Sequence, residues 1–302
     1  MIGSVPPPAP APAAAAPAVP PRWRLSGRLR PAATASRGRI RDWMLIAIPI
    51  AVTAMAILAP VIAPYDPVQP TGTPRLAPLS QHHLLGTDMI GRDNLSRVLL
   101  GLRTSWLLSI VVTATGLLVG GVVGVVAGMF GGWIDNVLMR LTEVFLALPS
   151  MLVAVAVAAA LGPGLVNTFL AVSLVWWPYY ARVIRGEVRA LAARPHIEAA
   201  RMAGAGPLRI MFRHLLPGVI PTAVVTASLD IGNVVLVLAS LSFLGLGQPA
   251  PAPELGADTS RGMVEILNAW WVPVVPGLVV MGLSLMSNLA GDAVRNRLSS
   301  RR

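Results

Sequence analysis

Residues 107–128, "LLSIVVTATGLLVGGVVGVVAG", set the class of fold. The stretch has no charged side chain, and about 20 such residues are enough for a helix to cross the hydrocarbon core of a bilayer. Glycine recurs at every fourth position, at Gly116, Gly120, Gly124 and Gly128, so these glycines share one face of the helix. A glycine face lets a second helix approach closely. We therefore expect a membrane-spanning helix that packs tightly against a neighbouring helix.

The whole chain has the composition of a membrane protein. Of its 302 residues, 55% are hydrophobic and only 12% are charged, whereas about 25% of a typical soluble domain is charged. Six apolar stretches have spanning length: 43–63, 104–129, 137–160, 166–184, 218–245 and 269–290. The sequence thus predicts an all-α polytopic membrane protein with six transmembrane helices.

The positions of the arginines predict the orientation in the membrane. All 24 basic side chains are Arg, and 19 of them fall in the two terminal segments and in the loops after the second and fourth spans. Because arginine is enriched in cytoplasmic segments, both termini are expected to be cytoplasmic. Residues 1–42, rich in Pro, Ala and Arg, read as a disordered tail. The predicted transmembrane domain is 43–290, and 291–302 form a basic cytoplasmic tail.

Two missing residue types exclude several kinds of chemistry. The chain has no cysteine, which excludes disulfides, thiolate nucleophiles and Cys-ligated metals. It has no lysine, so it lacks the P-loop and is not expected to hydrolyse ATP itself by that route. The arginines do not cluster on a polar fold with stacking aromatics, so nucleic-acid binding is not expected either.

A polar loop between the first two spans raises the question of a metal site. His82 and His83 precede Asp88 and Asp93, but this spacing is loose for a set of metal ligands. We expect a loop that forms hydrogen bonds within itself and holds no metal.

The largest internal cytoplasmic loop, 185–217, contains a charged helical hairpin. A short helix is predicted over about 196–203, followed by a turn of the kind that needs positive φ at Gly204. A second helix is predicted to begin at Pro207 and to end at Pro217. Its apolar residues share one stripe: Leu208, Met211, Phe212 and Leu215. The hairpin either anchors the loop at the membrane interface or docks a cytoplasmic partner.

Asp230 is the one acid well inside a predicted span. A carboxylate within the membrane is costly, and its presence suggests a function. Three roles are open: contact with the amino group of a ligand in a translocation path, pairing with a polar group on a sister subunit, or relay of a proton. The last role would suit a proton-coupled secondary transporter. Against that class, no pair of Gly/Pro-broken spans recurs in two halves of the chain.

The hairpin also carries a family motif. Glu198–Ala199–Ala200, followed by Gly204 and by Leu216–Pro217, resembles the EAA loop of ATP-binding-cassette importer permeases. His214 departs from the pattern, which usually has a branched aliphatic residue at that position.

Two further stretches resemble one subgroup of these permeases. Residues 84–105 contain Gly86, Thr87, Asp88, Gly91, Arg92 and Asp93, a series similar to the signature of the second permease in dipeptide, oligopeptide and nickel importers. Residues 239–256, "ASLSFLGLGQPAPAPELG", are similar to the end of the fifth span and the following loop in that subgroup. Glu254–Leu255 departs from the usual small polar residue and Trp. The resemblance covers roughly residues 40–295.

The resemblance implies a subunit of a larger machine in the cell membrane. A sister permease would supply the other half of the pore, and two ATPase subunits, or one fused ATPase, would bind ATP and magnesium inside. An external binding protein would deliver the ligand. This chain would bind no cofactor and would not be an enzyme. Peptides are the expected ligand, although relatives also carry nickel chelates, haem and oligosaccharides. The residues implied in ATPase docking are Glu198, Ala199, Ala200, Gly204, Leu208, Met211, Leu216 and Pro217.

Overall fold

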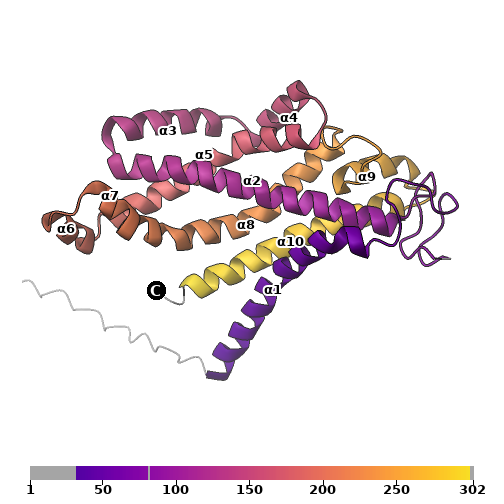
Figure 1. Ribbon diagram of the computed structural model, residues 1–302, viewed down its shortest axis with the longest axis horizontal. Helices are drawn as coiled ribbons and strands as arrows, with labels where there is room; N and C mark the ends of the chain where they lie inside the picture. Colours follow the sequence, from indigo (N-terminus) through magenta and orange to yellow (C-terminus); the bar gives the residue numbers. More distant parts are fainter. Residues whose placement is uncertain (1–31, 81, 300–302) are drawn as a thin grey trace, which may run out of the picture.

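The computed structural model describes residues 32–80 and 82–299, and this part of the chain folds into helices without a β-sheet (Figure 1). The helices are α1 (Ala32–Ile62), α2 (Asn94–Phe130), α3 (Gly132–Ala147), α4 (Ser150–Leu161), α5 (Leu165–Ala192), α6 (Pro195–Met202), α7 (Pro207–Ile210), α8 (Leu216–Phe243), α9 (Leu255–Gly262) and α10 (Trp271–Ser299). A π-helical segment, Met211–Leu215, joins α7 to α8, and a 3₁₀ turn, Met263–Glu265, follows α9.

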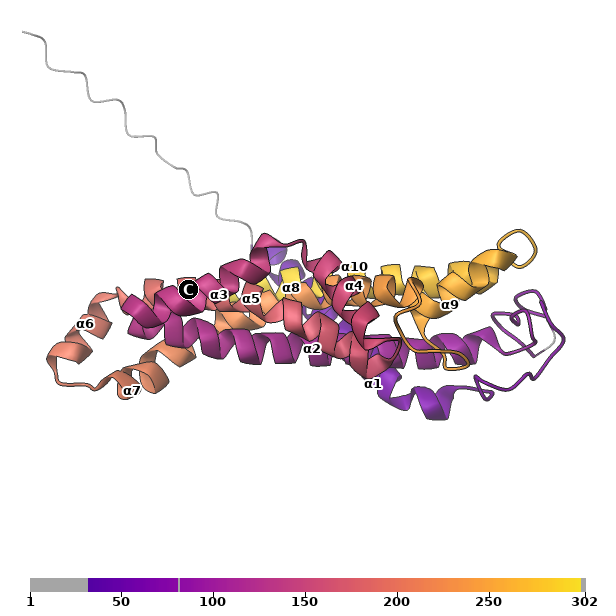
Figure 2. The same ribbon diagram turned by 90° about the horizontal axis from the view of Figure 1, so that it is seen from above.

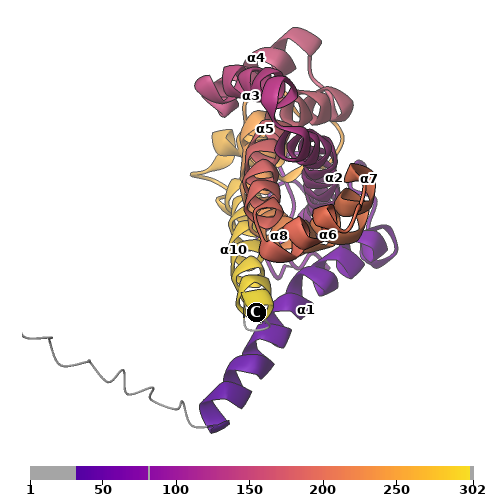
Figure 3. The same cartoon turned by 90° about the vertical axis from the view of Figure 1, so that its left-hand side faces the viewer.

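The long helices lie side by side along the longest axis of the molecule (Figures 1 and 2). Helices α6 and α7 lie at one end, whereas α9 and the loop between α1 and α2 lie at the opposite end. Seen end-on, α2, α5, α8 and α10 form the body, with α3 and α4 on one side and α1 on the other (Figure 3). The two ends of the molecule therefore carry different functional elements.

Four helical stretches are long and apolar enough to cross a membrane: Arg41–Ile62, Asn94–Phe130, Pro207–Phe243 and Trp271–Leu298. The bent pair α3 and α4 would make a fifth span within the described residues. Helix α5 has 28 residues but is not among these spans. Its middle is the less apolar run Trp176–Tyr180, in which Tyr180 is buried, the two tryptophans are half-buried and Tyr179 is exposed. The sixth predicted span, 166–184, stays a prediction.

The predicted span 137–160 is not one continuous helix. The chain turns by 85° between α3 and α4, and Leu148 and Pro149 at the turn have extended or non-helical backbone. Proline disfavours a helical conformation in the residue before it and donates no backbone hydrogen bond. Pro149 therefore divides the predicted span into two shorter helices.

Several helices also extend beyond the boundaries predicted from the sequence. Residues 1–31 of the predicted tail lie outside the described part, but residues 32–42 are helical rather than disordered. Helix α2 begins ten residues before the predicted start at 104, because the Asp93 carboxylate accepts a hydrogen bond from the Ser96 backbone N–H and caps the helix. Helix α10 continues through most of the predicted basic tail, to Ser299.

The prediction that Pro217 ends the second helix of the hairpin is wrong as well. Helix α7, the π-helical segment and α8 run on as one helix, Pro207–Phe243. The Leu216 N–H donates to the Met211 carbonyl, five residues back. The wider π turn accommodates the missing N–H of Pro217 at the cost of a shift in register. The predicted stripe is consequently split, with Leu208 and Phe212 exposed and Leu215 buried.

Candidate functional site

The hairpin of residues 195–215 is built on a buried apolar base. Ile197 of α6, Ile210 at the end of α7 and Leu215 of the π-helical segment are all buried. They pack in one cluster with Val188 and Leu191 on the last two turns of α5. The hairpin is therefore held firmly against the end of α5.

The rim of the hairpin carries exposed apolar side chains among exposed charged ones. Met202 is 87% exposed and Phe212 is 63% exposed. Gly204 forms the turn with φ +82°, and a Cβ there would meet nothing within 4 Å. The other residues implied in docking share this exposure or are half-buried: Glu198, Ala199, Leu208, Leu216 and Pro217 are exposed, and Ala200 and Met211 are half-buried. A rim with protruding apolar side chains on a fixed base is suited to seating in a groove.

The glycine face of α2 lies directly against α5. A Cβ on Gly120 would stand 2.2 Å from the Trp177 carbonyl oxygen, and one on Gly124 would stand 2.6 Å from the Ala181 carbonyl oxygen. Gly116 faces the Tyr180 ring, and Gly128 faces Val188. These distances leave no room for any side chain. Helices α2 and α5 consequently pack with their backbones in close approach.

An ion cluster that the sequence does not single out ties α3 to α5. The buried Asp135 carboxylate accepts hydrogen bonds from Arg185 Nε and Nη2, the latter at 2.7 Å, and from Arg189 Nη2. The partners are 50 and 54 residues apart in the chain, so no local pattern links them. The available signal was two arginines one turn apart on a predicted helix.

Asp230 has its partners within its own chain. The buried carboxylate accepts hydrogen bonds from Trp176 Nε1 and, at 2.8 Å, from Tyr180 Oη. Both donors lie on α5, one turn apart, whereas Asp230 lies on α8. The carboxylate thus links the two helices that lead into and out of the hairpin.

The signature residues of the outer loop close that loop on itself. Thr87 Oγ1 donates to the Thr73 carbonyl at 2.6 Å, and Asp88 accepts from Arg92 Nε at 2.6 Å. Gly86 and Gly91 have positive φ, and a Cβ on either would stand within 2.3 Å of a backbone oxygen. The structure therefore brings all six signature residues together, with Asp93 at the cap of α2.

His83 and the signature acids of this loop are engaged with protein groups, whereas His82 is exposed. His83 Nδ1 lies 2.9 Å from Asp93 Oδ1, and both side chains are buried. Across residues 32–80 and 82–299, no group of three His, Asp or Glu side chains is placed to hold a metal ion.

A second buried charge network holds the loop between α8 and α10. Arg97 of α2 pairs with Asp258 of α9 and donates to the Pro67 carbonyl at 2.8 Å. Glu254, next to this network, accepts from the Gln248 N–H at 3.3 Å. Burial is the main cause that raises the pKa of the Glu254 carboxyl to about 7, and the nearby Asp258 adds to it. A neutral Glu254 is thus favoured below neutral pH.

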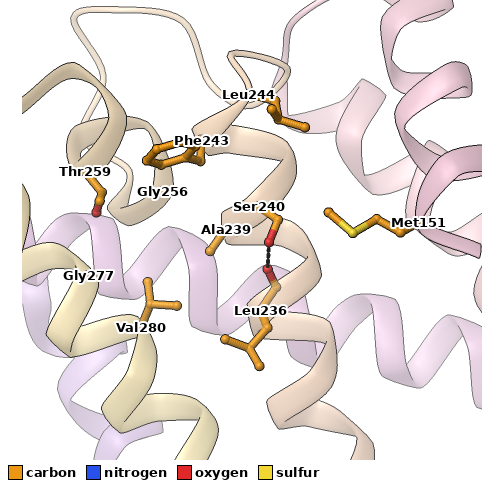
Figure 4. Close-up of a pocket in the computed structure, with 10 residues that line it drawn as sticks. All are labelled: Met151, Leu236, Ala239, Ser240, Phe243, Leu244, Gly256, Thr259, Gly277 and Val280. Atoms are coloured by element: carbon orange, nitrogen blue, oxygen red, sulfur yellow. Dashed lines mark hydrogen bonds between the residues drawn. The ribbon is translucent and has the colours of Figure 1, made fainter. Parts of the chain in front are cut away.

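An open cavity of about 320 Å³ lies over the C-terminal half of α8. Figure 4 shows Met151 of α4 on one side of α8, and Gly277 and Val280 of α10 on the other. The lining is mostly apolar: Met151, Leu236, Ala239, Ser240, Phe243, Leu244, Gly256, Thr259, Gly277 and Val280. The Ser240 hydroxyl, its main polar group, donates to the Leu236 carbonyl at 2.7 Å.

Comparison with known proteins agrees with this architecture. Residues 120–301 match the family described as binding-protein-dependent transport system inner membrane component. The chain belongs to this family. It is accordingly a multi-pass permease component of the inner membrane.

Curated relatives cover most of this permease. It is 37% identical over 265 residues to the probable D,D-dipeptide transport system permease protein DdpC of Escherichia coli (strain K12), covering 85% of this chain and 89% of that protein. It is 41% identical over 249 residues to the di/tripeptide transport system permease protein DppC of Pseudomonas aeruginosa (strain UCBPP-PA14), covering 80% and 82%. A third relative is the glutathione transport system permease protein GsiD of Pectobacterium atrosepticum, 39% identical over 247 residues, covering 81% and 82%.

Among solved structures, the permease is similar to a chain of the MetNI methionine ABC transporter in an inward-facing conformation. The TM-score is 0.54 at 22% sequence identity, and the match covers 67% of this chain and 96% of that one. The likeness extends the family assignment to the fold.

Proposed function

We propose that this permease forms half of the translocation pore of an ATP-driven importer that takes up peptides. The names of its relatives support this class of ligand, because they transport D,D-dipeptides, di- and tripeptides and glutathione. In the proposal a homologous sister permease supplies the other half of the pore. The cavity over α8 faces that subunit across the path, because it is open, apolar and set in the outer half of the helix body.

The observation that carries the proposal is the hairpin of residues 195–215. Its rim exposes large apolar side chains, while its base is buried against α5. We propose that it seats in a groove of an ATPase subunit, as the EAA loop resemblance implies. Two such subunits, or one fused ATPase, would bind ATP and magnesium. An extracytoplasmic binding protein would deliver the peptide at the opposite end, where α9 and the outer loop lie.

The proposed topology has six spans, both termini in the cytoplasm and the hairpin inside. The arginine distribution supports this orientation. Helix α5 would serve as one of the six despite its aromatic middle, because the glycine face of α2 and the Asp230 carboxylate both cover that region. Membership of a binding-protein-dependent family favours this importer over a proton-coupled transporter. Nickel chelates, haem and oligosaccharides are the alternative ligands.

The docking role is tested by two glycine substitutions in the same hairpin. Gly204→Val places a β-branched residue at φ +82°, where the strain is on the order of 1–2 kcal/mol. Gly206→Val is the matched control, because Gly206 has φ −67° and a Cβ there also meets nothing within 4 Å. Both variants should insert into the membrane normally. Only Gly204→Val should lower the recovery of ATPase subunits with the purified permease, by about fivefold or more.

The interfacial-anchor alternative predicts a different pattern. If the hairpin only lies on lipid, then Leu208→Asp should lower membrane abundance, and Gly204→Val should leave ATPase recovery unchanged. Full recovery of the ATPase subunits with Gly204→Val, together with ATP hydrolysis stimulated as in the wild type, would rule out docking through this turn.

A further inference from the structure

The ion cluster of Asp135, Arg185 and Arg189 lies at the stem of the hairpin. Arg185 and Arg189 occupy the last two turns of α5, which ends at Ala192 just before α6. Val188 and Leu191 on the same turns pack against the hairpin. The end of α5 is therefore held by the hairpin through one face and by the Asp135 carboxylate of α3 through another.

The remaining attachment of α3 to the body is apolar and includes the Phe145 ring, which lies edge-on to Trp177 of α5. Of its 16 residues, only Asp135, Met139 and Thr142 are buried. Met139 packs against Ala127 and Ala181. The opposite side of α3 is apolar and exposed, at Trp133, Val137, Leu141 and Val144. Asp135 thus supplies the charged link in an otherwise shallow apolar contact.

Helix α3 leads from this cluster to the cavity. It turns by 85° into α4, and Met151 in the first turn of α4 lines the cavity beside α8 (Figure 4). A displacement of the end of α5 can therefore reach Met151 through α3, provided that α3 follows α5. The Asp135 cluster is placed to make it follow.

We infer that Asp135 is a positioning residue that couples the hairpin to the α3–α4 bend through Arg185 and Arg189. The inference rests on the proposed function, since it assigns the route by which ATPase movement at the hairpin reaches the cavity. Without the carboxylate, α3 would slip along its shallow contact while α5 moves.

The exposure of the partners makes Asp135 the right member to remove. Asp135 is 4% exposed at its side chain, whereas Arg185 and Arg189 are 26% and 48% exposed. Removing an arginine would leave a buried carboxylate without its full complement of donors, which is strongly destabilising. Removing the carboxylate leaves arginines that water can solvate. Asp135→Ala should therefore weaken the link without unfolding the protein.

The test uses the complete complex with sister permease, ATPase subunits and binding protein in proteoliposomes. ATP hydrolysis and uptake of radiolabelled dialanine are measured together. Asp135→Ala should keep its ATPase subunits and its hydrolysis, while dialanine taken up per ATP falls about fivefold or more. Asp292→Ala is the matched control, because it breaks an exposed Asp–Arg pair on α10. It should leave the ratio of dialanine taken up to ATP hydrolysed unchanged. The double variant Asp135→Arg with Arg185→Asp, which exchanges the two charges, should restore this ratio.

A distance measurement gives a second readout that does not depend on the ligand. The chain has no cysteine, so spin labels can be placed at Val137→Cys on α3 and Met202→Cys on α6. The distance distribution between them should broaden in Asp135→Ala and narrow again in the charge exchange.

Two results would overturn the inference. One is a wild-type ratio of uptake to hydrolysis in Asp135→Ala with an unchanged distance distribution. The other is a parallel loss of assembly, hydrolysis and uptake, which would make the cluster a folding contact only. Failure of the proposed function looks different, because then the wild-type permease itself would bind no ATPase subunits or import no dialanine.

Discussion

At the scale of single residues, burial and partners decide between roles that composition leaves open. Asp230 illustrates this, because its carboxylate faces two donors of α5 rather than an open path. The same oxygen, Oδ2, accepts from both Trp176 and Tyr180. A role in holding α5 to α8 therefore accounts for an acid inside an apolar helix.

Two substitutions of Asp230 separate this role from contact with a ligand. Asp230→Asn keeps a carbonyl oxygen that can accept from both donors, so the yield of intact complex and the uptake of dialanine should stay close to wild type. Asp230→Leu removes the acceptor of the buried Tyr180 hydroxyl, at about 1–3 kcal/mol, and of the half-buried Trp176 N–H, so the yield on size-exclusion chromatography should fall. Normal yield but lost uptake in Asp230→Asn would instead show that the charge meets the ligand.

Glu254 predicts a dependence on pH in the loop between α8 and α10. Its pKa in the folded protein, about 7, is raised above the ordinary value of 4.5. The stabilisation from the protonated carboxyl is therefore fully present below pH 4.5 and is lost as the pH rises through 7. The loss is at most about 3 kcal/mol. The wild-type thermal midpoint should fall more between pH 5 and pH 8 than that of Glu254→Gln, and equal falls in both proteins would contradict this.

At the scale of helices, local signals predict well and long-range ones do not. The turn at Gly204 and the start of α7 at Pro207 follow from the φ preferences of the two residues, and the four-residue spacing of glycines predicts a close helix contact. The π turn before Pro217 is harder to predict, because a proline can end, kink or widen a helix depending on what packs around it. The link between Asp135 and α5 depends on tertiary placement, which no periodic pattern encodes.

The difference between local signals and long-range contacts also explains which features of the spans can be predicted from the sequence. The predicted apolar stretches are all helical, but apolarity does not specify where a helix bends or which helix lies innermost. Pro149 bends the third stretch by 85°, because it donates no backbone hydrogen bond and disfavours a helical conformation at Leu148. Helix α5 is less apolar than the spans around it, and part of its polar character is used inside the body, where Trp176 and Tyr180 donate to Asp230 of α8.

At the scale of the whole molecule, the two ends can be assigned to the two sides of the membrane by labelling. The chain has no cysteine, and three exposed positions mark the ends: Leu267 after α9 is 94% exposed, Met202 lies on the hairpin, and Leu161 ends α4. In intact spheroplasts, a membrane-impermeant maleimide should label Leu267→Cys and Leu161→Cys. Met202→Cys should be labelled only after permeabilisation.

Because α5 alone connects Leu161 to the hairpin, opposite labelling of Leu161→Cys and Met202→Cys means that α5 crosses the membrane despite its aromatic middle. Labelling of Met202→Cys in intact spheroplasts would instead place the hairpin outside, where no ATPase could reach it.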